Sequence, residues 1–130
     1  MEEARDFLKS LSKEIRRKIG INIRRVQKGE RNVELFKKLE GSEIWEFRTL
    51  YNKNYYRLFA FWDTDNDSLV IATHGIIKKT GKTPTKEISK AEELRKKYFD
   101  KVGSKNSVFL VHYQFILFNF GCFLFDLKSF

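Results

Sequence analysis

Residues 43–62 read EIWEFRTLYNKNYYRLFAFW, and this stretch decides the fold. Its first part, residues 43–49, alternates apolar with charged side chains, setting Trp45 and Phe47 against Glu46 and Arg48. That period of two is typical of a strand with one buried face. Its last part, residues 55–62, is almost wholly aromatic and aliphatic, and the polar run 52–54 between them is short enough for a tight turn. The stretch therefore predicts two antiparallel strands joined as a hairpin.

A third run rich in β-forming residues, 68–74, follows the polar residues 63–67. Such a short polar connection favours a neighbouring antiparallel strand. The sequence therefore predicts a three-stranded meander as the centre of the fold.

Helical patterns lie on both sides of the meander. Apolar residues recur at helical spacing near the amino end, at Leu8, Leu11, Ile15, Ile19, Ile23 and Val26. Ser12 predicts a new N-cap that divides this region into a short and a longer helix, and Gly20 argues against an unbroken second one. Beyond the strands, Thr83 is the predicted N-cap of a last helix, with Pro84 at its first position. The fold class predicted is α+β, with two N-terminal helices packed on a small antiparallel β-meander and a C-terminal helix after it.

Composition narrows the class of protein. The 130 residues suffice for one compact domain, and 26 Lys and Arg against 17 Asp and Glu give a formal charge of +9. Such an excess predicts an anionic partner. Cys122 is the only cysteine and there are two histidines, so we expect no disulfide framework, no metal and no cofactor. The charged amino terminus lacks the apolar core of a signal peptide, which favours a cytoplasmic protein.

The composition changes near residue 103. Residues 1–103 hold almost all of the charge, whereas 104–130 hold seven of the 13 Phe. We predict a domain over 1–103 and an atypical apolar tail over 104–130. The tail fits three interpretations: an added edge strand over 108–118, an adventitious extension, or, least favoured because polar residues interrupt it, a membrane segment.

The run from Gly75 to Thr83, GIIKKTGKT, resembles a phosphate-binding P-loop, but we reject that interpretation. The motif needs four residues between its glycines, and five separate Gly75 from Gly81. The neighbouring strands also have the pattern of a meander rather than of a βαβ unit.

Five cations are predicted to converge across the meander: Arg48, Arg57, Lys78, Lys79 and Lys82. Arg48 and Arg57 lie on the first and second strands, and the lysines follow the third. The alternative is an ordinary cross-strand ion pair between Glu46 and Arg48 and a solvated basic loop. Three nearby tyrosines are suited to stacking on nucleobases: Tyr51, Tyr55 and Tyr56.

Two further groups of residues carry alternatives of their own. His74 ends the third predicted strand, where it would serve as acid or base or simply be a hydrogen-bonded histidine at a strand end. Arg16 and Arg17 lie on the polar face of the second helix, which is either solvated or a support for a phosphate backbone.

Such a cation cluster suits cleavage of RNA. The ribose 2′-hydroxyl attacks the adjacent phosphorus, so the protein must hold the backbone in line and neutralise the charge that builds on the phosphoryl oxygens. Arginine offers a bidentate clamp, and a lysine of lowered pKa donates a proton. The sequence therefore favours a metal-independent RNA endonuclease.

Three segments carry a resemblance to a known family: LEGSEIWEFR at 39–48, YRLF at 56–59, and HGIIKKTGKTP at 74–84. In this order and spacing they resemble the phage-derived HigB-like toxins of the RelE/ParE superfamily, over roughly residues 2–100. The five cations fall on the family's basic positions. From this resemblance and the chemistry above, we expect catalysis by Arg57, Lys79, His74 and Lys78, and RNA binding by Arg48, Lys82, Tyr56, Arg16 and Arg17.

The resemblance implies a toxin of a type II toxin–antitoxin system that cleaves mRNA on the ribosome and so inhibits translation. Its implied partners are a helix-turn-helix, HigA-like antitoxin, the ribosome and mRNA, and no membrane. The alternatives are a non-enzymatic ParE-like inhibitor of DNA gyrase and an inactive basic RNA-binding relative. Two departures stand out: the family's usual first strand is missing, and members usually end near residues 98–101.

Overall fold

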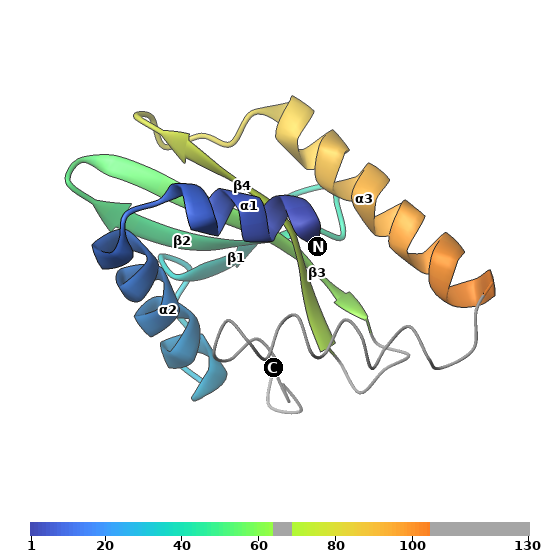
Figure 1. Cartoon of the computed structure of the whole chain (residues 1–130), viewed down its shortest axis with the longest axis horizontal. Coiled ribbons are helices and arrows are strands. Elements are labelled where there is room, and N and C mark those ends of the chain that lie inside the picture. Colours follow the sequence, from blue (N-terminus) through green and yellow to red (C-terminus); the bar gives the residue numbers. More distant parts are fainter. Residues whose placement is uncertain (64–68, 105–130) are drawn as a thin grey trace.

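Two helices, four strands and a third helix follow one another in the computed structural model, which describes residues 1–63 and 69–104 (Figure 1). Their bounds are α1 Glu2–Ser10, α2 Lys13–Gln27, β1 Phe36–Lys38, β2 Trp45–Tyr51, β3 Asn54–Asp63, β4 Leu69–Lys78 and α3 Thr85–Ser104. The strands form one antiparallel sheet in the order β1-β2-β3-β4. The predicted α+β class is confirmed, including its two leading helices and its final helix.

The sheet has one strand more than the predicted meander. β1 is only three residues long and reads FKK, too short to show an alternating pattern. It pairs with the first three residues of β2 and so forms an edge of the sheet. β4 also runs four residues past the predicted end at His74, because residues 75–78 pair with residues 55–58 of β3.

The hairpin between β2 and β3 has the predicted tight turn. Tyr51 pairs with Asn54, so the turn holds only Asn52 and Lys53, with φ of 47° and 61°. Two positive φ values are the pattern of a type I′ turn, whose twist matches that of the strands it joins. This turn fixes the register that places Arg48 directly opposite Arg57.

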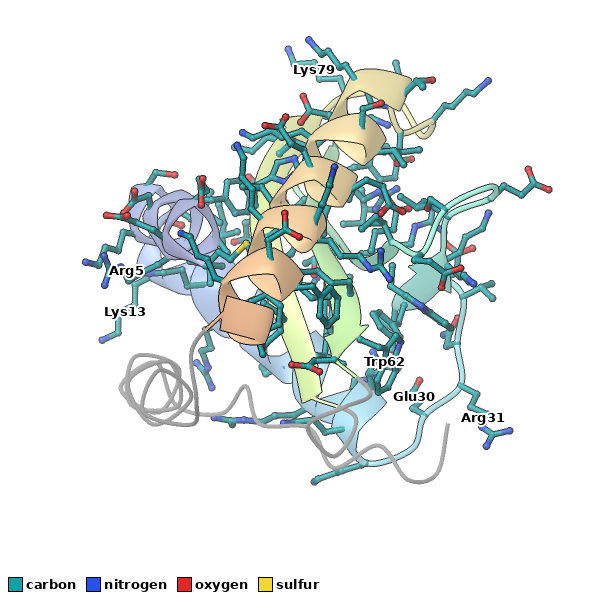
Figure 2. The ribbon with its side chains drawn as sticks, turned by 90° about the vertical axis from the view of Figure 1, so that its right-hand side faces the viewer. Arg5, Lys13, Glu30, Arg31, Trp62 and Lys79 are labelled. Atoms are coloured by element: carbon teal, nitrogen blue, oxygen red, sulfur yellow. The ribbon has the colours of Figure 1, made fainter. Side chains whose placement is uncertain are left out.

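The two faces of the sheet carry separate cores. Helices α1 and α2 cover the face that bears Phe47, Tyr56 and Leu58. Helix α3 covers part of the other face, where Phe59 and Phe61 are fully buried. In Figure 2, α1 lies to the left of the strands, whereas α3 runs in front of them. The predicted alternation is confirmed, since Phe47 lies in the core under α1 and α2, whereas Glu46 and Arg48 share the face that α3 covers in part.

A β-bulge interrupts the pairing of β3 with β4. Leu58 pairs with Gly75 and Ala60 with Ala72, so Phe59 stands opposite two residues, Thr73 and His74. Bulges of this kind re-aim side chains and are frequent beside functional sites. Here the bulge precedes the last segment of β4, which ends at Lys78.

The helix ends agree with the predictions in part. Ser12 caps α2 by accepting from the Ile15 backbone N–H, and Gly20 leaves α2 unbroken. The predicted cap Thr83 is wrong: α3 begins at Thr85, and the Thr83 hydroxyl donates instead to Glu46. Most of the predicted turn 63–67 lies outside the described residues, and so does the predicted tail 104–130 apart from Ser104, the last residue of α3. None of the helices in the described ranges is long and apolar enough to cross a membrane.

Gly75 lies where α1 crosses β4, and the Phe7 ring rests against it so closely that a Cβ would overlap the ring. We predict that Gly75→Ala lowers the free energy of unfolding by about 1–3 kcal/mol, the usual cost of overpacking. Urea denaturation measures this loss. In a Phe7→Ala background the same change is expected to cost almost nothing, and an equal cost in both backgrounds would contradict the packing argument.

Candidate functional site

Three cations from three neighbouring strands share the sheet face that α3 covers in part. Arg48 of β2 and Arg57 of β3 are direct register partners. Lys78 of β4 pairs with Tyr55, two residues along β3 from Arg57, and therefore lies on the same face. A diagonal pair of this kind is about 7–8 Å apart at the backbone, well within reach of long side chains. The expected convergence is thus present for Arg48, Arg57 and Lys78.

A buried carboxylate, Glu46, holds this group together. Its Oε1 lies 3.2 Å from Arg48 Nε and 3.6 Å from Arg57 Nε. Its Oε2 accepts a hydrogen bond from the Thr83 hydroxyl at 2.7 Å. The ion pair between Glu46 and Arg48 that was weighed as an alternative therefore exists, but as one part of a larger cluster. One buried carboxylate balances only one of three cations, so the cluster keeps an excess of positive charge.

The charge of Arg57 and Lys78 is held away from water. Arg57 is 2% exposed and Lys78 is 8% exposed. Within residues 1–63 and 69–104, neither Lys78 Nζ nor Arg57 Nε and Nη2 has a hydrogen-bond partner. Burial of cationic donors without acceptors is costly, and a bound anion would offset that cost. These nitrogen atoms are therefore available to an anionic ligand.

Burial and mutual repulsion shift the acidity of both groups. Burial lowers the pKa of the Lys78 ammonium, and the nearby Arg57 guanidinium lowers it further, while Glu46 opposes them. Burial also lowers the pKa of Arg57, and Arg48 adds to the shift. A lysine of lowered pKa gives up its proton more readily than a solvated one, so Lys78 is suited to general-acid chemistry.

Arg48 is fixed from the side of β1. Its Nη1 donates to the Val33 carbonyl oxygen at 3.0 Å and lies 3.9 Å from an oxygen of the exposed Glu34. The segment before β1 therefore borders the cluster opposite β4. This border was missed from the sequence, because residues 28–35 carry no strand or helix pattern.

Lys79 and Lys82 lie in the exposed connection from β4 to α3. The hydrogen bond from Thr83 to Glu46 ties the end of this connection to the cluster. Figure 2 shows Lys79 pointing outward at the end of the molecule where α3 begins. The two lysines thus flank the buried cations rather than joining them.

His74 is not brought to the cations. Its ring lies against Phe59, its Nε2 is 2.9 Å from Glu87 Oε2, and its Nδ1 is 3.1 Å from Thr73 Oγ1. Burial lowers the pKa of His74 below its usual value, although Glu87 opposes the shift. A neutral ring then carries its proton on Nε2 and donates it to the Glu87 carboxylate. This geometry ties the first turn of α3 to the sheet.

Three residues expected to bind RNA lie on the opposite side of the sheet. Tyr56 is buried in the core under α1 and α2. Arg16 and Arg17 belong to α2, which packs on that same face through Ile19 and Ile23. The sheet therefore lies between these three residues and Arg57. Tyr55, which the sequence offered beside Tyr56 for base stacking, is on the side of the cations: Arg57 Cζ lies 5.1 Å from its ring centroid.

The period of two could have singled out Tyr55 among the tyrosines as the one beside the cations, because a residue two positions from Arg57 shares its face. No such signal marks Thr83, whose bond to Glu46 depends on a loop that folds back. In the described part of the chain, no three His, Cys, Asp or Glu side chains gather in a way that would hold a metal ion.

Fold and site together define a small basic α+β protein with a cation cluster set into one face of its sheet. Residues 6–96 match the family model described as Phage derived protein Gp49-like (DUF891). This match spans more than half of the chain, so the protein belongs to that family, which is associated with toxin–antitoxin proteins of the RelE type. No curated protein and no solved structure matches the chain.

Because the Lys78 ammonium has no acceptor among the described residues, we predict that Lys78→Met raises the free energy of unfolding at pH 7 by about 1 kcal/mol or more. The folded chain binds this proton less tightly than the unfolded chain does. Stability of the wild type should therefore rise with pH between the lowered pKa of Lys78 and its ordinary value of 10.5, and the advantage of the variant should shrink there.

Urea denaturation across that pH range measures the effect. Lys97→Met is the matched control, because Lys97 is an exposed lysine paired with Glu93 on α3, and its loss should change stability by less than about 0.5 kcal/mol. A Lys78→Met protein less stable than the wild type at pH 7 would refute the prediction.

Proposed function

We propose that this chain is the toxin of a type II toxin–antitoxin pair and that it cleaves mRNA on the ribosome, as the HigB-like toxins it resembles do. The observation that carries the proposal is the group formed by the buried Arg57 and Lys78 with the half-buried Arg48, whose free donor atoms suit a phosphate. The family's association with toxin–antitoxin systems supports it. That association also implies an antitoxin partner, for which we propose a HigA-like helix-turn-helix protein.

The cleavage needs no group that the chain lacks. The 2′-oxygen of one ribose forms a bond to phosphorus while the bond from phosphorus to the 5′-oxygen breaks, leaving a 2′,3′-cyclic phosphate and a 5′-hydroxyl. Arg48 and Arg57 neutralise the non-bridging oxygens, where charge builds in the transition state. Lys78 donates its proton to the departing 5′-oxygen. Glu46 is already paired with both arginines and Thr83, so the proton of the 2′-hydroxyl passes to water.

The remaining candidate residues take supporting roles in this proposal. Lys79 and Lys82 contact neighbouring phosphates from the loop, which adds affinity that salt weakens. His74 acts as a positioning residue, since its bond to Glu87 holds α3 and the preceding loop against the sheet. Arg16 and Arg17 face away from the cations and contact only a partner that extends around the molecule, such as ribosomal RNA.

We predict that Arg57→Gln and Lys78→Met each reduce mRNA cleavage by about 10²–10³-fold, the loss typical of removing one group that stabilises developing charge. Each chain is expressed from an inducible promoter, and primer extension maps cuts in a translated message. The wild type should cut within the reading frame, and the cuts should vanish when the start codon is removed.

Arg5→Gln on α1 and Lys97→Met on α3 are the matched controls, expected to cut like the wild type because both lie away from the cation cluster. Wild-type cleavage by Arg57→Gln would reject the proposed site. Intact messages accompanied by DNA breaks would instead favour inhibition of gyrase, and normal growth would favour an inactive relative.

A further inference from the structure

We infer that Tyr55 and Leu50 form a seat for a nucleobase beside the cation cluster, and that the RNA bound there is single-stranded at this nucleotide. The inference rests on the proposed function and adds to it the form of the substrate and the residues that select it. Tyr55 is one of the three tyrosines that the sequence offered for base stacking, whereas Leu50 was not expected to bind RNA.

The sheet register places this seat next to the arginines. Leu50 of β2 pairs with Tyr55 of β3, and Tyr55 pairs with Lys78 of β4, so the three form one row across the sheet. The adjacent row on the same face holds Arg48 and Arg57. Two residues along a strand span about 7 Å, so the rows are about that far apart. A phosphate on the arginines therefore has the base of an adjoining nucleotide over Leu50 and Tyr55.

Two apolar side chains beside the cations, those of Leu50 and Val33, are exposed, as a surface that binds a ligand would be, and are not part of the core. Leu50 is 54% exposed, although it shares its face with the buried Arg57. Val33, whose carbonyl oxygen accepts from Arg48, is 62% exposed. Single exposed apolar residues are ordinary, but here two of the four most exposed large ones in the described residues border the same cations. Apolar surface beside cations that suit a phosphate matches a nucleotide, which has a flat apolar base and an anionic linkage.

Tyr55 has the geometry of a stacking platform. Its ring is half-buried and lies 5.1 Å from the Arg57 guanidinium carbon, a cation–π contact that holds the ring beside the cluster. Aromatic rings of this kind bind bases of any sequence by stacking. The neighbouring Tyr56 cannot serve, because it is buried on the opposite face.

A base in a duplex is already stacked and paired, so it cannot lie flat on Tyr55 without leaving its neighbours. Proteins that contact bases in RNA by stacking therefore bind single-stranded segments. The seat thus selects unpaired RNA. It leaves the identity of the base open, since the side chain of Leu50 has no polar group that could read the edge of the base.

The test measures binding apart from cleavage. The full chain is titrated with a single-stranded hexanucleotide whose 2′-hydroxyls are replaced by fluorine, which prevents cleavage, and whose central base is the fluorescent 2-aminopurine. Stacking quenches this fluorescence. The wild type and Tyr55→Phe should bind and quench alike, whereas Tyr55→Leu should bind about tenfold more weakly with little quenching. Ile77→Ser is the control, because Ile77 is an exposed apolar residue on the other face.

Removal of the central base completes the test. Because this removes the fluorescent base, binding is followed by calorimetry. The wild type should bind the abasic hexanucleotide more weakly than the intact one, whereas Tyr55→Leu should bind both alike, because its seat is already gone. Equal losses for both chains, equal competition by a duplex, or no binding of the hexanucleotide would overturn the inference. If Arg57→Gln loses binding while Tyr55→Leu does not, the base seat is wrong and the phosphate site stands. If binding depends on Tyr55 but messages remain uncut in cells, the seat stands and the proposed cleavage fails.

Discussion

The site depends on one buried carboxylate. Glu46 draws the guanidinium groups of Arg48 and Arg57 to one of its oxygens and receives the Thr83 hydroxyl on the other. Without it, adjacent arginines on paired strands would repel each other and turn toward water. It joins three parts of the chain that are distant in sequence: β2, β3 and the connection to α3. Because it neutralises only one charge, it also leaves the cluster able to attract an anion.

The support for this group comes from both ends of α3. His74 binds Glu87 in its first turn, and Tyr98 near its other end donates a 2.6 Å hydrogen bond to the buried Asp63 of β3. Between these polar contacts, Ala91 packs without exposed surface in the apolar core under the helix. The helix is thereby fixed along the sheet, and the loop before it stays over Glu46. A rigid support of this kind is what a phosphate site needs, since small displacements weaken catalysis sharply.

Strict alternation in the strands and helical spacing in the segments that flank them were what the sequence could convey about this fold. The alternation placed Glu46 and Arg48 on one face and Phe47 on the other, and the meeting of Arg48 with Arg57 followed from the hairpin. It could not show β1, whose three residues have no pattern, nor the bond from Thr83, which depends on a loop. Tyr56 was expected to bind RNA, but alternation through the aromatic run puts Tyr55, and not Tyr56, on the face of Arg57. At about 3.4 Å per residue, the four residues from His74 to Lys78 keep the imidazole apart from the cations.

The two-residue turn at Asn52 and Lys53 restricts the changes of length that the hairpin can accept. Because it sets the pairing of β2 with β3, a one-residue slip of that pairing would turn each side chain of β3 to the reverse side. Arg57 would then enter the hydrophobic core beneath α1 and α2, and Leu58 would lie on the other face of the sheet. An extra residue in this hairpin is therefore compatible with the site only where a bulge in the turn absorbs it.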